Sequence, residues 1–321
     1  MGLHRSVGRC YAVRRPVLEA RGQPRNPMER HLNPSDAGER ECGASAPRKG
    51  TEDPRHFLIP GEHLPPGFAA RLDDASFEPA ATSPAATVVV ARPGRKNMEV
   101  LLLRRPTRSG FAAGAWVFPG GRVDPSDSDP SIASGLAGLD PAEWADRLGL
   151  EHPAEALAFV VAALREAWEE TGILIGHASG GSDLQQVRRA LLSGELDMAE
   201  AVARTGIRFR VDDLIYIAHW ITPEPEPRRY DTRFFLARVG LGTDCVLEGE
   251  ELAEGRWMTP GQAMEQFREG AMMLLPPTAD TLRRLGEFSD LDEAWSSLVD
   301  APVPSILPRM RRDPAGVMIE F

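Results

Sequence analysis

The sequence predicts an α/β fold in which a mixed β-sheet carries helices on its faces. Short segments rich in β-branched residues predict strands, and segments rich in Ala, Leu and Glu predict helices. The two kinds interleave without the regular spacing of βαβ units, which favours a mixed sheet over a parallel one. With 321 residues, 42% of them hydrophobic, the chain can bury a sizeable core.

Four segments predict strands. Ala85–Ala91 and Glu99–Arg104 flank a Pro-Gly dipeptide, and this arrangement predicts a hairpin. Two further strands are expected at Leu214–Trp220 and Thr232–Val239.

Four segments predict helices. Pro153–Thr171 carries the clearest pattern, because Pro stands at its start, Gly172 follows its end, and helix-forming residues fill it. A capping Asp before a proline predicts a short helix over Pro141–Leu148. Two later helices are expected at Pro260–Glu269 and Thr278–Phe288.

The first 56 residues are predicted to form a disordered leader. They hold scattered Pro and Gly and show no periodic apolar face. Their arginine-rich, acid-poor start leaves an organelle transit peptide open, although a disordered leader or a start codon assigned too early is favoured.

Charge and composition limit the partners. The net charge of −10 argues against a nucleic-acid duplex, and the longest apolar runs fall short of the roughly 18 residues of a membrane-spanning helix. A phosphate-bearing small ligand held through a metal stays open. Cys10, Cys42 and Cys245 are widely spaced, which argues against a disulfide framework and favours a reducing compartment. We therefore expect a cytoplasmic protein, and a homodimer is left open.

Three carboxylates lie near the end of the predicted helix Pro153–Thr171. Glu166, Glu169 and Glu170 share one helical face, where like charges oppose the helix by about 0.2–0.5 kcal/mol per pair. The helix dipole also disfavours anions at this end. A bound cation would remove both penalties, and clustered carboxylates suit Mg²⁺ or Mn²⁺. The alternative is a solvated acidic helix face.

A second segment, Trp116–Asp124, is an apolar strand that runs into a Pro-Gly-Gly turn and then an acid. Gly120 and Gly121 lack side chains, so the backbone here can approach another element or a ligand closely.

Together the two segments resemble the Nudix box, whose pattern is G-x5-E-x7-R-E-U-x-E-E-x-G-U, with U an aliphatic residue. Arg165–Ile173 matches every fixed position of the second half, and Gly121 matches the opening glycine. Asp124 stands where many members carry a glutamate. Gly121 and Arg165 are 44 positions apart instead of 14, so about 30 residues are inserted within the box.

The first glutamate of the box is displaced by this insertion. Counted back from Arg165, it falls at Leu157, which cannot bind a metal. Glu155 and Glu151 are left as its replacements.

Further segments are similar to the Nudix branch that includes acyl-coenzyme A diphosphatases: Arg108–Gly121, His219–Pro223 and Arg228–Phe235. The resemblance implies an α/β/α sandwich over residues 84–275 with a box-loop insertion at about 125–153. Residues 57–83 would be a linker, and residues 276–321 a C-terminal helical extension. We expect the insertion to border the site and to shape substrate choice.

The resemblance also implies a chemistry, the metal-dependent hydrolysis of a nucleoside diphosphate derivative. Glu166, Glu169 and Glu170 would hold Mg²⁺ or Mn²⁺, with Glu169 also counted as catalytic, and Arg165 would orient a carboxylate. A downstream glutamate would add a ligand or act as the base. Glu251 is favoured for this role from the set Glu248, Glu250, Glu251 and Glu254.

Substrate contacts are assigned to Gly120, Gly121, Arg228 and Arg229. Paired guanidiniums suit a diphosphate or a 3′-phosphate, and a surface ion pair is the alternative for either arginine alone. Coenzyme A or acyl-coenzyme A is the favoured substrate. An NADH or ADP-sugar diphosphatase and a non-catalytic nucleotide sensor are the alternatives.

Overall fold

The computed structural model describes residues 9–10, 56–61, 64, 67–74, 76–95, 97–106, 112–181, 183–248 and 252–321. Its helices are α1 (Phe68–Arg71), α2 (Pro141–Leu148), α3 (Pro153–Thr171), α4 (Leu184–Leu192), α5 (Met198–Thr205), α6 (Pro260–Arg268), α7 (Pro276–Leu285) and α8 (Leu291–Leu298). Its strands are β1 (Arg9–Cys10), β2 (His56–Pro60), β3 (Thr82–Pro93), β4 (Met98–Arg104), β5 (Trp116–Val117), β6 (Gly120–Arg122), β7 (Leu136–Ala137), β8 (Gly176–Ala178), β9 (Ile207–Arg210), β10 (Leu214–Ile221), β11 (Arg229–Arg238), β12 (Glu254–Met258), β13 (Ser305–Ile306), β14 (Arg309–Asp313) and β15 (Gly316–Glu320). Apart from Arg9–Cys10, the predicted leader up to residue 55 lies outside the described residues.

A mixed sheet forms the centre of the fold. Its strands follow the order β1-β12-β4-β3-β11-β10-β13, with β5 paired to β4 and β6 paired to β3. Strand β3 pairs in parallel with β11 and antiparallel with β4. The mixed sheet expected from the sequence is therefore confirmed.

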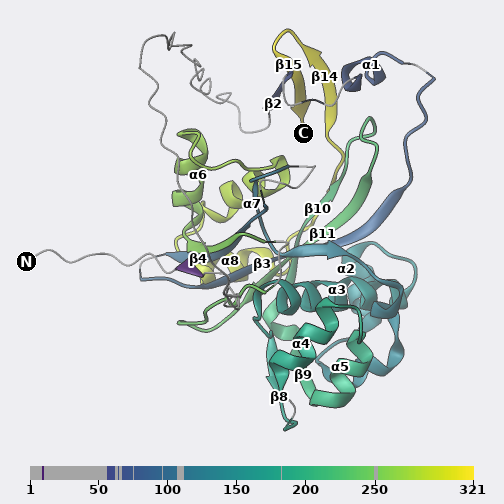
Figure 1. Ribbon diagram of the computed structural model, residues 1–321, viewed down its shortest axis with the longest axis vertical. Helices are drawn as coiled ribbons and strands as arrows, with labels where there is room; N and C mark the ends of the chain where they lie inside the picture. Colours follow the sequence, from purple (N-terminus) through teal and green to yellow (C-terminus); the bar gives the residue numbers. More distant parts are fainter. Residues whose placement is uncertain are drawn as a thin grey trace, which may run out of the picture.

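Helices cover both faces of this sheet (Figure 1). Along β3, Val88 and Val90 pack into a core with α2 to α5, whereas Val89 and Ala91 pack into a second core with α6 to α8. This alternation follows from the two-residue period of a strand, which sends successive side chains to opposite faces. The α/β/α sandwich is confirmed.

The predicted strands and helices are present with small shifts at their ends. Helices α1, α4, α5 and α8 were not expected from the sequence. Residues 276–321 contain α7 and α8 followed by β13 to β15, so this extension is helical only in its first part. The predicted linker contains β2, which pairs antiparallel with β15 in a separate three-stranded sheet.

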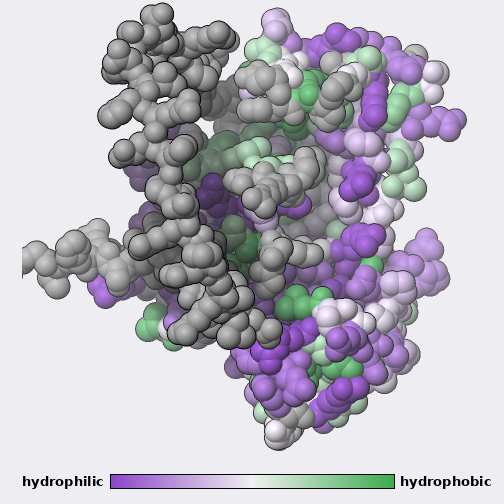
Figure 2. Space-filling view, in the orientation of Figure 1, coloured by the Kyte–Doolittle hydropathy of each residue, from purple (hydrophilic) through white to green (hydrophobic). Residues whose placement is uncertain are grey.

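The inserted segment after β6 is part of the core. Ile132, Leu136, Trp144 and Leu148 are buried in the cluster that covers one sheet face. Strand β7 of the insertion pairs with β9, which follows α5 in the chain. The insertion and the α4–α5 segment therefore build one lobe beside α3, and the outer surface of this lobe is largely hydrophilic (Figure 2).

Two expectations about environment can be compared with the fold. Within the described ranges, no helix is long and apolar enough to cross a membrane. The wide cysteine spacing argued against a disulfide framework, yet Cys245 is disulfide-bonded. The reducing compartment inferred from cysteine spacing loses its support.

Candidate active site

Helix α3 carries the acidic cluster. The helix begins at Pro153, and Gly172 ends it with a φ of 72°, a left-handed conformation that favours glycine. Its first half is apolar and packs in the core, which fixes the position of the second half. Glu166 is buried and Glu169 and Glu170 are half-buried, so the alternative of a fully solvated acidic face does not apply.

Arg165 is the centre of an ion-pair network. Its Nε and Nη2 donate to Asp127 Oδ1 and Oδ2 at 2.9 and 3.0 Å. Its Nη1 donates to Glu166 Oε1 at 2.8 Å and to Glu169 Oε2 at 3.1 Å. A further bond at 2.9 Å reaches the carbonyl oxygen of Arg122. Three carboxylates therefore accept hydrogen bonds from one guanidinium, and Asp124 Oδ2 lies 3.7 Å from its Nη2.

Asp127, fully buried, is the residue that the sequence analysis missed. It is the sixth residue after Gly121, where the Nudix pattern places its first glutamate. Counting forward from Gly121 finds it, whereas counting back from Arg165 crosses the insertion and fails. Glu155 and Glu151, expected to replace that glutamate, are both exposed and do not contact Arg165.

Burial controls the electrostatics of this network. It raises the pKa of Glu166 to about 7, helped by the nearby charges of Glu169 and Asp127 and opposed by Arg165. Burial also raises the pKa of Glu169 and of Asp127, although Arg165 lowers both. Burial opposes the charge of Arg165, but its carboxylate partners outweigh this and raise its pKa. The carboxylates of this network therefore carry more negative charge than Arg165 alone can balance.

The Gly120–Gly121 turn lies against the carboxylates. The backbone N–H of Gly120 donates to Glu170 Oε2 at 3.0 Å. A Cβ atom on Gly121 would lie 2.2 Å from Glu166 Oε1, and one on Gly120 would lie 2.6 Å from the carbonyl oxygen of Ala86. Only glycine fits this approach, so the structure brings the turn and the acidic helix together as expected.

The donor set suits a hard divalent cation. Glu166, Glu169 and Glu170 offer carboxylate oxygens from one and a half turns of one helix, in a region with excess buried negative charge. In the part of the chain that is described, no three His, Cys, Asp or Glu side chains converge as a metal-binding group. Here Glu166 and Glu169 instead accept from Arg165, and Glu170 accepts from Gly120. The residues fit the chemistry of such an ion.

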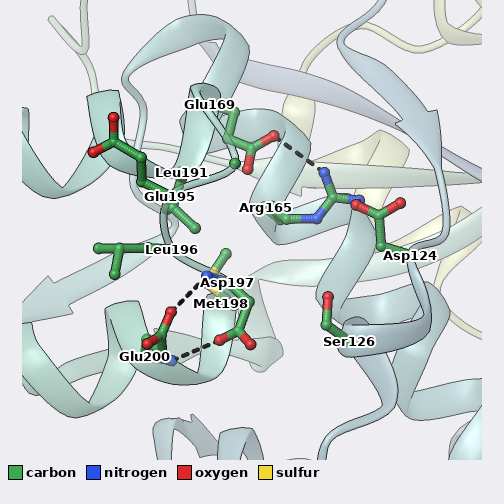
Figure 3. A pocket seen from close by; sticks show the side chains of 11 residues that line it. Asp124, Ser126, Arg165, Glu169, Leu191, Glu195, Leu196, Asp197, Met198 and Glu200 are labelled. Carbon is green, nitrogen blue, oxygen red and sulfur yellow. Dashed lines mark hydrogen bonds and ion pairs between the residues drawn. The ribbon is translucent and has the colours of Figure 1, made fainter.

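A pocket of about 330 Å³ lies beside Arg165 and Glu169 (Figure 3). Its opposite wall is the connection between α4 and α5, residues 191–200, where Asp197 and Glu200 cap α5 by reciprocal hydrogen bonds. Of the insertion, which is described throughout residues 125–153, Ser126 alone lines this pocket. The α4–α5 connection therefore forms most of the wall that we expected from the insertion.

The two arginines expected to bind substrate lie where β11 begins. Arg229 pairs with Thr82, whereas Gly121 pairs with Ala86, so their positions along β3 are roughly 13 Å apart. The guanidinium of Arg229 donates to the carbonyl oxygens of Thr222 and Ala80 at 3.1 and 2.8 Å. Arg228 is exposed.

The expected downstream base, Glu251, lies outside the described residues, as does Glu250. Glu254 pairs with Arg256 at 2.6 Å in β12. Glu248 is half-buried, and its Oε1 lies 3.9 Å from Nη1 of Arg189.

Comparisons with known proteins agree with these features. A family model described as the NUDT19 Nudix domain matches residues 142–285. The acyl-coenzyme A diphosphatase NUDT19 of Gallus gallus is 30% identical over 265 residues, which cover 65% of this chain and 69% of that protein. Its namesake from Homo sapiens is 28% identical over 240 residues, which cover 63% and 64%. The chain thus spans about two thirds of the length of these relatives.

A solved structure shares the fold. The crystal structure of a Nudix hydrolase from Alicyclobacillus acidocaldarius superposes with a TM-score of 0.57 at 28% identity. The match covers 70% of this chain and 99% of that one.

Proposed function

Because the chain belongs to the Nudix hydrolase family, in the NUDT19 branch, we propose that it hydrolyses the diphosphate bond of coenzyme A or acyl-coenzyme A in a reaction dependent on Mg²⁺ or Mn²⁺. The observation that carries the proposal is the acidic face of α3, which packs against the Gly120–Gly121 turn. The guanidinium of Arg165 pairs with the carboxylates of this face. The choice of coenzyme A follows the named activity of the NUDT19 relatives.

Glu166, Glu169 and Glu170 would hold the metal. When bound, such an ion neutralises charge on the diphosphate and lowers the pKa of a bound water. Arg165 orients Glu166 and Glu169 through its hydrogen bonds, and Asp127 fixes Arg165 in turn. The carboxylates are thereby pre-positioned before substrate arrives, which avoids reorganisation during the reaction.

We assign the base to Glu251 and the substrate contacts to the Gly120–Gly121 turn and to Arg228 and Arg229. The exposed Arg228 is available for a phosphate group of the substrate. The bonds of Arg229 to two carbonyl oxygens fix its guanidinium at the start of β11, next to Arg228.

The test is a hydrolysis assay on the purified full-length chain. Coenzyme A, an acyl-coenzyme A, NADH and ADP-ribose are each incubated with Mg²⁺ or Mn²⁺, or with EDTA, and products are identified by mass. We expect the coenzyme A compounds to be cleaved fastest, at the diphosphate, and EDTA to abolish cleavage. Faster cleavage of NADH or ADP-ribose would support the alternative diphosphatase. Nucleotide binding without any turnover would support the sensor.

A further inference from the structure

Arg188 is a completely buried arginine on α4, outside the box. Its Nε and Nη2 donate to the carbonyl oxygen of Glu169 at 3.1 and 2.8 Å. Its Nη2 also donates to the carbonyl oxygen of Val246 at 2.7 Å. One side chain therefore joins α4, the last turn of α3 and the segment that leads to Glu248.

The carbonyl groups at the end of α3 explain why a cation is useful there. A helix leaves its last carbonyl oxygens without partners inside the helix. Here the oxygen of Trp168 accepts from Gly172 N at 2.8 Å, and that of Thr171 accepts from Val246 N at 2.7 Å. Arg188 satisfies the oxygen of Glu169. Its positive charge also opposes the unfavourable placement of the Glu169 carboxylate at a helix C-terminus.

The surroundings of Arg188 are shaped to receive a guanidinium. A Cβ atom on Gly172 would lie 2.9 Å from Arg188 Nη1, so a residue with a side chain would crowd it. Burial lowers the pKa of Arg188, while the charges of Glu248 and Glu169 oppose that change. A buried charge is costly unless it is well paired, so these contacts offset a substantial desolvation cost.

In the described part of the chain, two buried polar atoms of this region have no hydrogen-bond partner. Nη1 of Arg188 and Oε2 of Glu248 are both buried, and neither has a hydrogen-bond partner among the described residues. The charge of Glu248 acts on Arg188 more strongly than that of Glu169 does. The segment that leads to Glu248 is held against the end of α3 by the two hydrogen bonds of Val246, one to Thr171 and one from Arg188.

We propose that Arg188 is a positioning residue for the catalytic carboxylates. By fixing the backbone of Glu169, it sets the direction of the Glu169 and Glu170 side chains, and it locks the Val246–Glu248 segment beside them. Leu191, one turn further along α4, lines the pocket beside Glu169. Because Arg188 anchors α4 to the end of α3, it also positions Leu191 in the pocket wall. This inference rests on the proposed function, which assigns Glu169 and Glu170 to the metal.

The test compares Arg188→Met, which removes the charge and the donors, with Arg188→Lys, which keeps the charge but loses the two-pronged donor. Arg189→Met is the matched control. Arg189 is adjacent on the same helix and carries the same charge, but its side chain is 56% exposed, and its one ion pair in the described residues, to Glu248, is long at 3.9 Å. Such an exposed pair contributes little, so this control separates the loss of a charge from the loss of the buried hydrogen bonds. Circular dichroism and thermal melting establish that each protein is folded.

The decisive measurement is Mn²⁺ binding without substrate, followed by electron paramagnetic resonance, with kcat and KM measured separately. We expect Arg188→Met to weaken Mn²⁺ binding by about 10-fold or more, as for other residues that support metal ligands. We expect kcat to fall with little change in KM, partial recovery in Arg188→Lys, and wild-type behaviour in Arg189→Met.

A folded Arg188→Met protein with wild-type Mn²⁺ affinity and kcat would overturn the inference and leave Arg188 a purely structural residue. Should Arg188→Met fail to fold, Arg188→Lys decides by the same two readouts. Failure of the proposed function is distinguishable, because it appears in the wild-type protein as absent Mn²⁺ binding or absent hydrolysis.

Discussion

The carboxylate of Asp127 and the guanidinium of Arg165 form a two-pronged ion pair across 38 positions of sequence. The pair joins the loop after β6 to the helix α3, so both halves of the box meet in spite of the inserted residues between them. Asp127 lies in a capped 3-10 turn, where its Oδ2 accepts from Asp124 N at 2.8 Å. The contact that closes the box loop is thus made by one of the first residues of the insertion expected at about 125–153.

Replacing Asp127 with alanine should destabilise the fold. Loss of one partner from a buried ion pair typically costs about 3–5 kcal/mol, and we expect at least ~2 kcal/mol here because Glu166 and Glu169 still pair with Arg165. Urea unfolding at pH 7 measures the difference. Asp124→Ala is the control, since its carboxylate is 52% exposed and 3.7 Å from Arg165. Equal losses in the two variants would contradict the role given to Asp127.

Replacing Glu169 or Glu170 with glutamine should reduce kcat by about 10²-fold or more, as when a group that stabilises transition-state charge is removed. Each change keeps the shape of the side chain, so circular dichroism should be unaltered. Glu155→Gln, in the exposed first turn of the same helix, should keep wild-type kcat. Near-normal turnover in both variants would remove these glutamates from the metal site.

The sequence predicts those parts of the fold that depend on local patterns. The strands over residues 85–91 and 214–220 and the helix α3 each carry their own periodicity and end signals, and the structure has them within a few residues. The acidic face of α3 follows from spacing alone. Helices α4 and α5 were not predicted, although Asp183 and Asp197 cap their N-termini.

Contacts between distant segments could not be predicted in this way. Arg228 and Arg229 are indistinguishable in the sequence, yet only Arg229 is shown bonded to carbonyl oxygens, one of them on Ala80, 149 positions away. Arg188 likewise meets Glu169 and Val246 only because α4 packs beside the end of α3. Such roles depend on tertiary packing, which no local pattern encodes.

The Gly121→Ala variant tests the close approach of the box turn to α3. The added Cβ would lie 2.2 Å from Glu166 Oε1, and that carboxylate is buried and tied to Arg165, so it must move away from its present position. We expect kcat to fall by about 10-fold or more, as when support of a metal ligand is lost. Steady-state kinetics with Mn²⁺ measures this.

The control for that change is Gly261→Ala, at a position in α6 where nothing lies within 4 Å of the added atom. Alanine is favoured over glycine in a helix, so this variant should be as stable as wild type or more so. Unchanged kcat in Gly121→Ala would mean that the turn tolerates a side chain and that Glu166 can be displaced without loss.

Asp231 is expected to make the stability of the fold depend on acidic pH. Its Oδ1 lies 2.6 Å from His219 Nε2 and also accepts from Arg233. Burial raises the pKa of Asp231, but the hydrogen bond from His219 and the charge of Arg233 outweigh it and hold the pKa below its ordinary value of 3.8. The ionised carboxylate is thus favoured in the folded state.

The sign of the effect follows from linkage. A group whose pKa is depressed by folding contributes stability that is fully present above its unfolded pKa and is lost as pH falls through its folded pKa. Arg233 keeps its charge over this whole range. The window for Asp231 therefore lies below about pH 4.

Urea unfolding of wild type and Asp231→Asn at pH 7, 5, 4 and 3 tests this prediction. The stability difference between them should shrink as pH falls below about 4, because the wild-type carboxylate is then protonated and resembles the amide. Glu78→Gln, which removes an exposed carboxylate, controls for the loss of one negative charge. A difference that stays constant down to pH 3 would show that His219 and Arg233 do not stabilise the ionised form of Asp231.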